Sequence, residues 1–304
     1  MMRWFSVVML GATVLIVPAA WADEAPVTPA AIYQAGDALY NQLAAYHTAN
    51  ASQPAEDPDA PALTERLPRH VFQKAREVLL KVEALRKLKG LPENPVPQVA
   101  VREIVPADTM KLLTQALADT KELASAFGNP PMPPTPPLVE GKTPTDAYDK
   151  LSKVSLSLDG LGLPASVPND VYRIALTMVS DIELIRAARK ISTPVADSGD
   201  ISPKKPADVY DIAYALLSDL KTLVESNPDY AIPKGIILPN KRAGTIKPSY
   251  ALEMMNLVQA ETTAIKAKVG ATQPTELAPP QSGKSPTDTY KQETLARALI
   301  AALK

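Results

Sequence analysis

Apolar residues recur every three or four positions in eight stretches of the chain, and each stretch begins at a proline. In one stretch they are Val71, Ala75, Val78, Val82, Leu85 and Leu88. This spacing places the apolar side chains on one face of an α-helix. It predicts helices over residues 29–48, 68–90, 106–127, 144–159, 168–191, 206–225, 248–269 and 286–303. With only 12 glycines and 31 prolines, the composition is typical of helices joined by proline-rich connectors.

The eight helix starts form two sets of four that repeat along the chain. The first set is Pro29, Pro68, Pro106 and Pro144, and the second is Pro168, Pro206, Pro248 and Pro286. Corresponding prolines are separated by 139, 138, 142 and 142 residues. An internal repeat of this kind determines the architecture. We therefore expect an all-α fold made by internal duplication, with tandem four-helix units at residues 23–163 and 164–304.

Each predicted start combines several groups that favour helix initiation. Proline suits the first helical position because its fixed φ fits the helix and its missing N–H would be unpaired there anyway. Thr28, Thr143 and Ser285 precede it in three copies, and these residue types cap helices well. Aspartate occupies the third helical position at Asp108, Asp146, Asp170, Asp208 and Asp288. A carboxylate there can accept the cap N–H and face the positive end of the helix dipole.

The connectors between the predicted helices are long and rich in proline, except for a short link at residues 160–167 that joins the two units. Proline-rich segments are stiff and extended, at about 3.1 Å per residue. A connector of this kind is long enough to return along a helix, which would let consecutive helices run in parallel. Antiparallel neighbours are the commoner arrangement in helical bundles, and the sequence leaves the helix directions within each unit open.

A tyrosine lies four residues after the proline in five of the eight copies. These are Tyr33, Tyr148, Tyr172, Tyr210 and Tyr290. Phe72 and Met110 replace it in two others, and neither carries a hydroxyl. This favours a ring that packs against a neighbouring helix. The alternative is a ligand-binding role, for which the candidates are Tyr148, Tyr172 and Tyr290.

The N-terminal residues predict export. Arg3 precedes an apolar run at residues 4–17, and the small residues Ala20 and Ala22 then suit signal cleavage after Ala22. The run is shorter than the roughly 20 residues of a membrane-spanning helix, and no later stretch is apolar enough to span a membrane. We expect a periplasmic protein; the alternatives are secretion, or anchoring by an uncleaved N-terminal segment.

Composition and motifs exclude several kinds of site. The chain has no cysteine, and its 32 basic and 33 acidic residues give no footprint for nucleic acid. We expect His47 and His70, the only histidines, to be surface residues rather than metal ligands. The Gly-Lys-Thr and Gly-Lys-Ser tripeptides at 141 and 283 lack the earlier glycine of a phosphate-binding loop. We therefore expect no metal, no cofactor and no catalytic residue.

The resulting functional hypothesis is an exported, non-enzymatic binding, scaffold or ligand-sensing module of the cell envelope. Its partner would be an envelope protein or a small ligand, bound near residues 160–167 or near the repeated tyrosines. One alternative is an exported hydrolase with an acid-based active site. Another is a structural or stress protein without a small ligand. Oligomeric state and ligand identity do not follow from the sequence.

Overall fold

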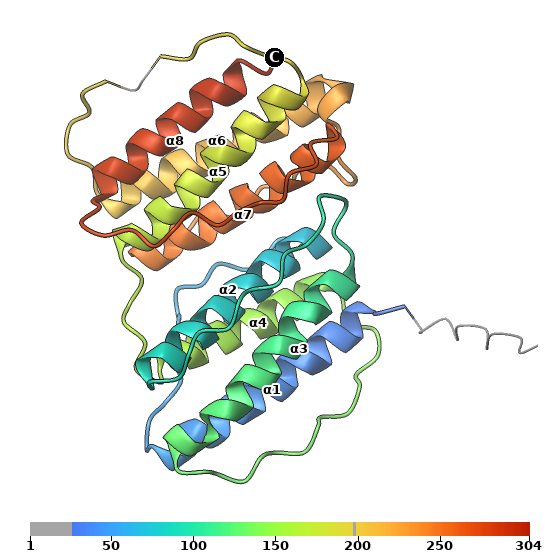
Figure 1. Cartoon of the computed structure of the whole chain (residues 1–304), viewed down its shortest axis with the longest axis vertical. Coiled ribbons are helices and arrows are strands. Elements are labelled where there is room, and N and C mark those ends of the chain that lie inside the picture. The colour runs from blue at the N-terminus through green and yellow to red at the C-terminus, as the bar shows by residue number, and fades with distance from the viewer. Residues whose placement is uncertain (1–25, 197–198) are drawn as a thin grey trace, which may run out of the picture.

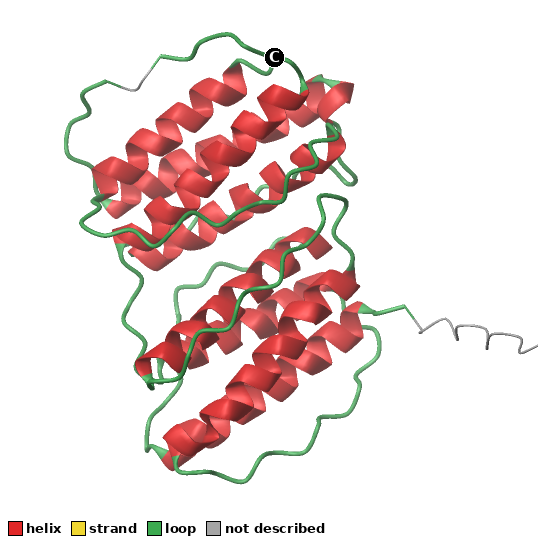
Figure 2. Ribbon diagram, viewed as in Figure 1, coloured by secondary structure: helices red, strands yellow, loops and turns green. Residues whose placement is uncertain are grey.

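The computed structural model describes residues 26–196 and 199–304, and this part of the chain is helical without strands (Figures 1 and 2). The predicted all-α fold is confirmed. The α-helices are α1 (Pro29–Ala49), α2 (Pro68–Leu88), α3 (Pro106–Glu122), α4 (Pro144–Asp159), α5 (Pro168–Ala188), α6 (Pro206–Ser226), α7 (Pro248–Lys268) and α8 (Pro286–Ala301). Short 3-10 helices follow α3 at Leu123–Phe127 and α6 at Pro228–Tyr230. The predicted signal segment lies outside the described residues. None of the described helices has the length and apolar character needed to cross a membrane.

Every helix begins at its predicted proline, and acidic side chains complete most of the starts. Asp146 accepts the backbone N–H and the hydroxyl of Thr143 at 2.8 and 2.6 Å. These bonds hold the pKa of Asp146 below its usual range. Where the cap side chain cannot help, the aspartate acts alone: Asp170 accepts from the N–H of Val167 at 2.9 Å. The carboxylate therefore compensates for poor cap chemistry.

The first four helices, α1 to α4, run in the same direction. Their opening prolines, Pro29, Pro68, Pro106 and Pro144, line one shallow depression, so all four starts lie at one end. Their last turns also meet: the Tyr46 hydroxyl donates to the Thr120 carbonyl at 2.5 Å, and Arg86 pairs with Glu122 at 2.6 Å. The structure therefore adopts the parallel alternative and not the commoner antiparallel arrangement. The long connectors explain the difference, because each returns along the bundle before the next helix begins (Figure 1).

The second four helices reproduce this packing. α1 and α2 each contact α3 and α4, and α5 and α6 each contact α7 and α8 in the corresponding way. Hydrogen bonds between connectors and helix starts are repeated as well. The N–H of Arg66 donates to Thr145 at 2.9 Å, and the N–H of Lys204 donates to Thr287 at the same distance. We call helices α1–α4 the first group and α5–α8 the second group. Their matching contacts are those expected of an internal repeat, while the domain boundaries stay a prediction.

Four of the five repeated tyrosines lie beneath a basic side chain from the end of a connector; for Tyr148 it is Arg66, 4.9 Å from the ring centre. The Lys142 ammonium lies 4.5 Å from the centre of the Tyr33 ring, and Lys284 lies 4.6 Å from Tyr172. Lys204 likewise lies 4.6 Å from Tyr290. A cation over an aromatic face is attracted by the ring quadrupole. These tyrosines therefore attach the returning connector to the helix starts.

The two groups meet through α2 and α7, which lie side by side and antiparallel (Figure 1). Arg69, near the start of α2, pairs with Glu261 near the end of α7 at 2.8 Å. Asn256, earlier in α7, donates to Glu77, later in α2, at 3.1 Å. The reversal follows from the short link at 160–167, because α5 starts close to where α4 ends.

Both histidines are buried, so the expectation of surface residues is wrong. His47 is 4% exposed, and its Nε2 lies 2.9 Å from the Ser157 carbonyl oxygen. His70 is 2% exposed and takes the place of the aspartate at the start of α2. Its Nδ1 accepts the N–H of Leu67 at 3.0 Å, which leaves Nε2 to donate to Glu261 at 2.6 Å. Burial lowers the pKa of His70, although Glu261 opposes the shift.

One core residue breaks the repeat. Glu293 in α8 is fully buried, neither carboxyl oxygen has a hydrogen-bond partner among the described residues, and burial raises its pKa well above the usual range. The repeat offset of 142 aligns it with Leu151 in α4, which is also fully buried. A carboxyl group without a partner is costly in such a place.

We therefore expect Glu293→Leu to raise the free energy of unfolding by about 1–3 kcal/mol at pH 7, because it removes an unpaired buried carboxyl group while keeping similar volume. Urea unfolding measures the change. The matched variant Leu151→Glu should destabilise the protein by about 3 kcal/mol or more. A destabilised Glu293→Leu protein would show that Glu293 has a partner or role that this packing does not reveal.

Candidate functional site

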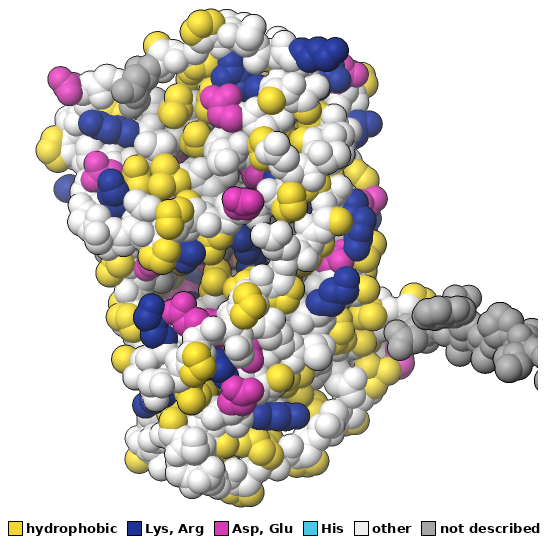
Figure 3. All heavy atoms as spheres, in the orientation of Figure 1, with side chains coloured by type: hydrophobic (Ala, Val, Ile, Leu, Met, Phe, Trp, Pro, Cys, Tyr) yellow, Lys and Arg dark blue, Asp and Glu magenta, His cyan; other side chains and the backbone are white. Residues whose placement is uncertain are grey.

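Two adjoining cavities lie where the helix groups meet. The larger, which we call the main cavity, has a volume of about 510 Å³, and the smaller, the side cavity, about 290 Å³. They share the lining residues Glu77, Lys81, Asp159, Ser166 and Leu252. Figure 3 shows that the molecule is hollowed at this level, with basic and acidic side chains interspersed over the visible face. The sequence-based expectation of a pocket near residues 160–167 agrees with this position, since Leu163 and Pro164 line the main cavity.

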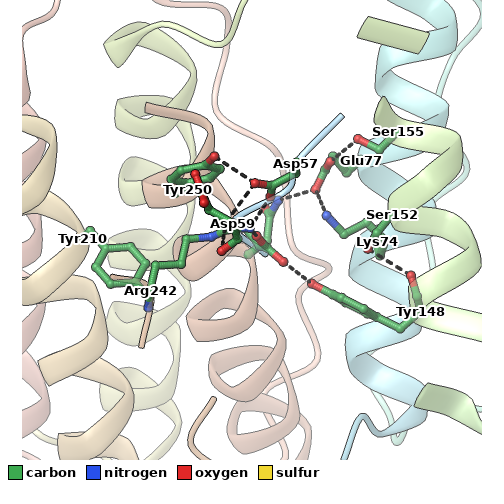
Figure 4. Close-up of polar contacts among 12 residues, drawn as sticks. Asp57, Asp59, Lys74, Glu77, Tyr148, Ser152, Ser155, Tyr210, Arg242 and Tyr250 are labelled. Carbon is green, nitrogen blue, oxygen red and sulfur yellow. Dashed lines mark hydrogen bonds and ion pairs between the residues drawn. The ribbon is translucent and has the colours of Figure 1, made fainter. Parts of the chain in front are cut away.

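The side cavity is bordered by an ion-pair network that joins a connector of the first group to the second group (Figure 4). Arg242, in the connector before α7, pairs with Asp57 at 2.5 Å, and the Tyr250 hydroxyl donates to the same carboxylate at 3.0 Å. The guanidinium also stacks 3.7 Å from the centre of the Tyr250 ring. Burial alone would raise the pKa of Asp57, but the hydrogen bonds from Arg242 and Tyr250 hold it below its usual range.

Glu77 is the residue through which three helices are linked. Its carboxylate receives Lys74 of α2 at 2.9 Å, the Ser155 hydroxyl of α4 at 2.7 Å and Asn256 of α7 at 3.1 Å. Burial would raise the pKa of Glu77, but the charges of Lys74 and Lys81 lower it to about 2. Figure 4 shows Lys74 and Ser155 pointing at this carboxylate from two sides. Glu77 therefore remains an anion, and these hydrogen bonds occupy both of its carboxylate oxygens.

A second cluster of charges, which we call the Glu261 clamp, joins the two groups near the start of α2. Glu261 accepts hydrogen bonds from Arg69 and His70 at 2.8 and 2.6 Å and is itself buried. Arg69 also donates to the carbonyl oxygens of Pro233 and Gly235 in the second group. Buried charges that each make several hydrogen bonds therefore join α2 to the second group at two points, one at Glu77 and one at Glu261.

A carboxyl pair, Glu83 and Asp119, lies at the edge of the main cavity, and Glu83 lines the cavity itself. Asn94 donates its N–H to Glu83 at 2.5 Å and its side-chain amide to Asp119 at 2.7 Å. The other oxygen of each acid, Glu83 Oε1 and Asp119 Oδ2, has no donor among the described residues. Burial, and to a lesser degree the neighbouring Asp119, raises the pKa of Glu83 to about 7. The folded protein therefore keeps Glu83 partly protonated at neutral pH.

The predicted tyrosine candidates do not form one site. Tyr148 is buried at the interface between the groups, and its hydroxyl donates to Glu253 at 3.3 Å (Figure 4). Tyr172 and Tyr290 are half-buried at the start of the second group beneath Lys284 and Lys204. None of the three lines the main or the side cavity. Their ligand-binding role stays a prediction.

The polar residues of the main cavity were missed at the level of sequence. They include Arg76 of α2 and Arg173 of α5. One signal in the sequence could have identified them: at both positions the corresponding residue of the other repeat is uncharged. Arg76 aligns with Tyr214, and Arg173 aligns with Gln34. Within residues 26–196 and 199–304, no group of three or more His, Cys, Asp or Glu side chains could hold a metal ion.

The Glu83–Asp119 pair predicts a pH-dependent stability. In the unfolded chain Glu83 loses its proton near pH 4.5, whereas in the folded protein it does so near pH 7. The folded state therefore holds more protons between these values, and stability falls as the pH rises through them. We expect Glu83→Gln to remove this decline, so that its free energy of unfolding relative to wild type improves by roughly 2–3 kcal/mol from pH 5 to pH 8.

Urea unfolding at several pH values checks this expectation. Glu103→Gln is the control, because Glu103 is exposed and its variant should follow the wild-type curve. A Glu83→Gln curve parallel to that of wild type would mean that folding does not raise the pKa of Glu83.

Comparison with family models, curated proteins and solved structures found no match to this chain. The functional argument therefore depends on the chemistry and geometry of the site alone.

Proposed function

We propose that this protein is an exported, non-enzymatic binding module that holds a small ligand in the main cavity between its two helix groups. The observation that carries the proposal is the cavity itself, about 510 Å³ in volume and lined by Leu80, Leu163, Ile174 and Leu277 together with a few polar side chains. Ligand sites of soluble proteins typically have this size and this mixture. The predicted signal segment at residues 1–22 supports export.

The rigid surroundings of the cavity support binding rather than simple scaffolding. The Asp57–Arg242 pair, the Glu77 contacts and the Glu261 clamp bridge the two groups without a ligand. A preformed site loses little conformational entropy on binding. The cavity would therefore be available in the free protein.

One observation favours the alternative of a hydrolase with an acid-based site. Glu83 lines the main cavity and titrates near neutral pH, as a general acid or base would. However, its side chain is buried and accepts the N–H of Asn94, whose amide binds the buried Asp119. This arrangement favours a structural role for Glu83 over a catalytic one. Turnover of an envelope-derived substrate that is lost in Glu83→Gln would reverse this preference.

The binding proposal predicts that filling the cavity abolishes binding. Ala84 is exposed on α2 and lines the main cavity, so Ala84→Trp should place an indole ring in the cavity while preserving the fold. We expect wild type to bind the neutral apolar dye N-phenyl-1-naphthylamine with increased fluorescence, and Ala84→Trp to bind it at least tenfold more weakly.

The matched control is Ala187→Trp, since Ala187 is also an exposed alanine near the end of a helix but lines neither the main nor the side cavity. It should bind the dye as wild type does. Equal dye binding by all three proteins, or no binding by wild type, would contradict a ligand site in the main cavity.

A further inference from the structure

The acids that line the main cavity are all engaged by other groups. Glu77 is paired with Lys74 at 2.9 Å, Asp159 with Lys81 at 2.7 Å and Glu93 with Lys87 at 2.8 Å. The remaining two are Asp170, which accepts the N–H of Val167, and Glu83, which accepts the N–H of Asn94. Acids outnumber bases on the wall, but each of these carboxylates already has a partner.

Two arginines of the same cavity form no ion pair with a described residue. Arg76 also makes no hydrogen bond with any described residue, and the carboxylate whose charge acts on it is that of Asp181. Both oxygens of Asp181 are occupied, by Lys266 at 2.5 Å and by Gln259 and Thr275 at 2.7 Å. Arg173 donates its Nε to the Ala278 carbonyl, and its terminal nitrogens have no partner in the described part of the chain.

The two guanidinium groups disfavour one another. Burial lowers the pKa of Arg76 and the charge of Arg173 lowers it further, while Asp181 opposes the shift. Burial likewise lowers the pKa of Arg173, while Asp170 and Glu93 oppose the shift. An arginine nevertheless remains protonated at neutral pH. Two like charges that are partly removed from water therefore raise the free energy of the unliganded protein. An oxyanion between them would remove this penalty and could accept several charge-assisted hydrogen bonds.

The residues around the two arginines indicate the chemistry of the rest of the ligand. Leu80, Leu163, Ile174 and Leu277 supply an apolar wall to the main cavity. Arg76 also lines a neighbouring cavity of about 480 Å³, together with Phe72 and Val99. A ligand with its charged head at Arg76 would therefore have apolar surface on both sides of the head for a hydrocarbon chain.

We propose that the main cavity binds an amphipathic oxyanion, whose carboxylate or phosphate head lies between Arg76 and Arg173 and whose apolar chain packs on Leu80 and Ile174. This inference rests on the proposed binding function and specifies the ligand class. Arg76 belongs to the first helix group and Arg173 to the second, so the head bridges the two groups. Binding therefore strengthens the interface between them and raises the temperature of unfolding.

Isothermal titration of the full chain tests the proposal with three eight-carbon probes: octanoate, octyl phosphate and the neutral 1-octanol. We expect one or both anions to bind at least tenfold more tightly than 1-octanol. The preferred anion distinguishes a carboxylate from a phosphate ligand. Arg76→Gln and Arg173→Gln should each weaken anion binding by roughly 10- to 100-fold, as expected for the loss of charge-assisted hydrogen bonds, and leave 1-octanol binding unchanged.

Lys87→Gln is the matched control. Lys87 lines the same cavity but is paired with Glu93, and its side chain is 73% exposed, so the variant should bind the anions as wild type does. Circular dichroism confirms that each variant is folded. Equal affinity for all three probes, or equal loss in Lys87→Gln, would overturn the oxyanion proposal while leaving an apolar ligand site in place. If wild type binds the dye but neither anion, the oxyanion proposal is also overturned and the apolar ligand site remains. If it binds neither the dye nor the anions, the proposed function is overturned as well.

Discussion

The common direction of the four helices in each group is the constraint on which the rest of the structure depends. Parallel neighbours cannot be joined by a tight turn, so each connector must return the length of a helix. A 21-residue helix is about 32 Å long, and an extended segment of roughly 17 residues covers about 50 Å. Proline keeps such a segment extended, which explains why the connectors contain so many of the chain's 31 prolines. The tyrosines beneath Lys142, Lys204 and Lys284 then fasten the returning segment at the helix starts.

Parallel packing also brings like ends of helix dipoles together, and the sequence contains the charges that offset this. Aspartates such as Asp108 and Asp208 lie in the first turn, and basic residues such as Arg86 and Lys121 lie in the last. Each favours the helix end beside it. The acids at the third position thus have two effects: they cap the individual helix, and they reduce the repulsion among neighbouring starts.

The candidate site follows from the way the two groups meet rather than from either group alone. The antiparallel contact of α2 with α7 is held at one end by Glu261 and at its middle by Glu77. Connectors add to this contact, through Asp57 with Arg242 and through Arg69 with Gly235. The main and side cavities lie beside it, and residues of both groups line each of them. Arg76 and Arg173 reach the same cavity because they belong to opposite groups.

The sequence by itself determined the helices, their starts and the repeat, because these depend on local spacing, cap chemistry and proline, all of which act within a few residues. It did not determine helix direction, since a long connector permits either direction and only side-chain packing selects one. Nor did it predict that His70 would be buried against Glu261, or that Arg76 would lie in the same cavity as Arg173. Those contacts join residues about 100 to 190 positions apart, and only the tertiary structure decided them, because burial and charge pairing depend on which surfaces meet.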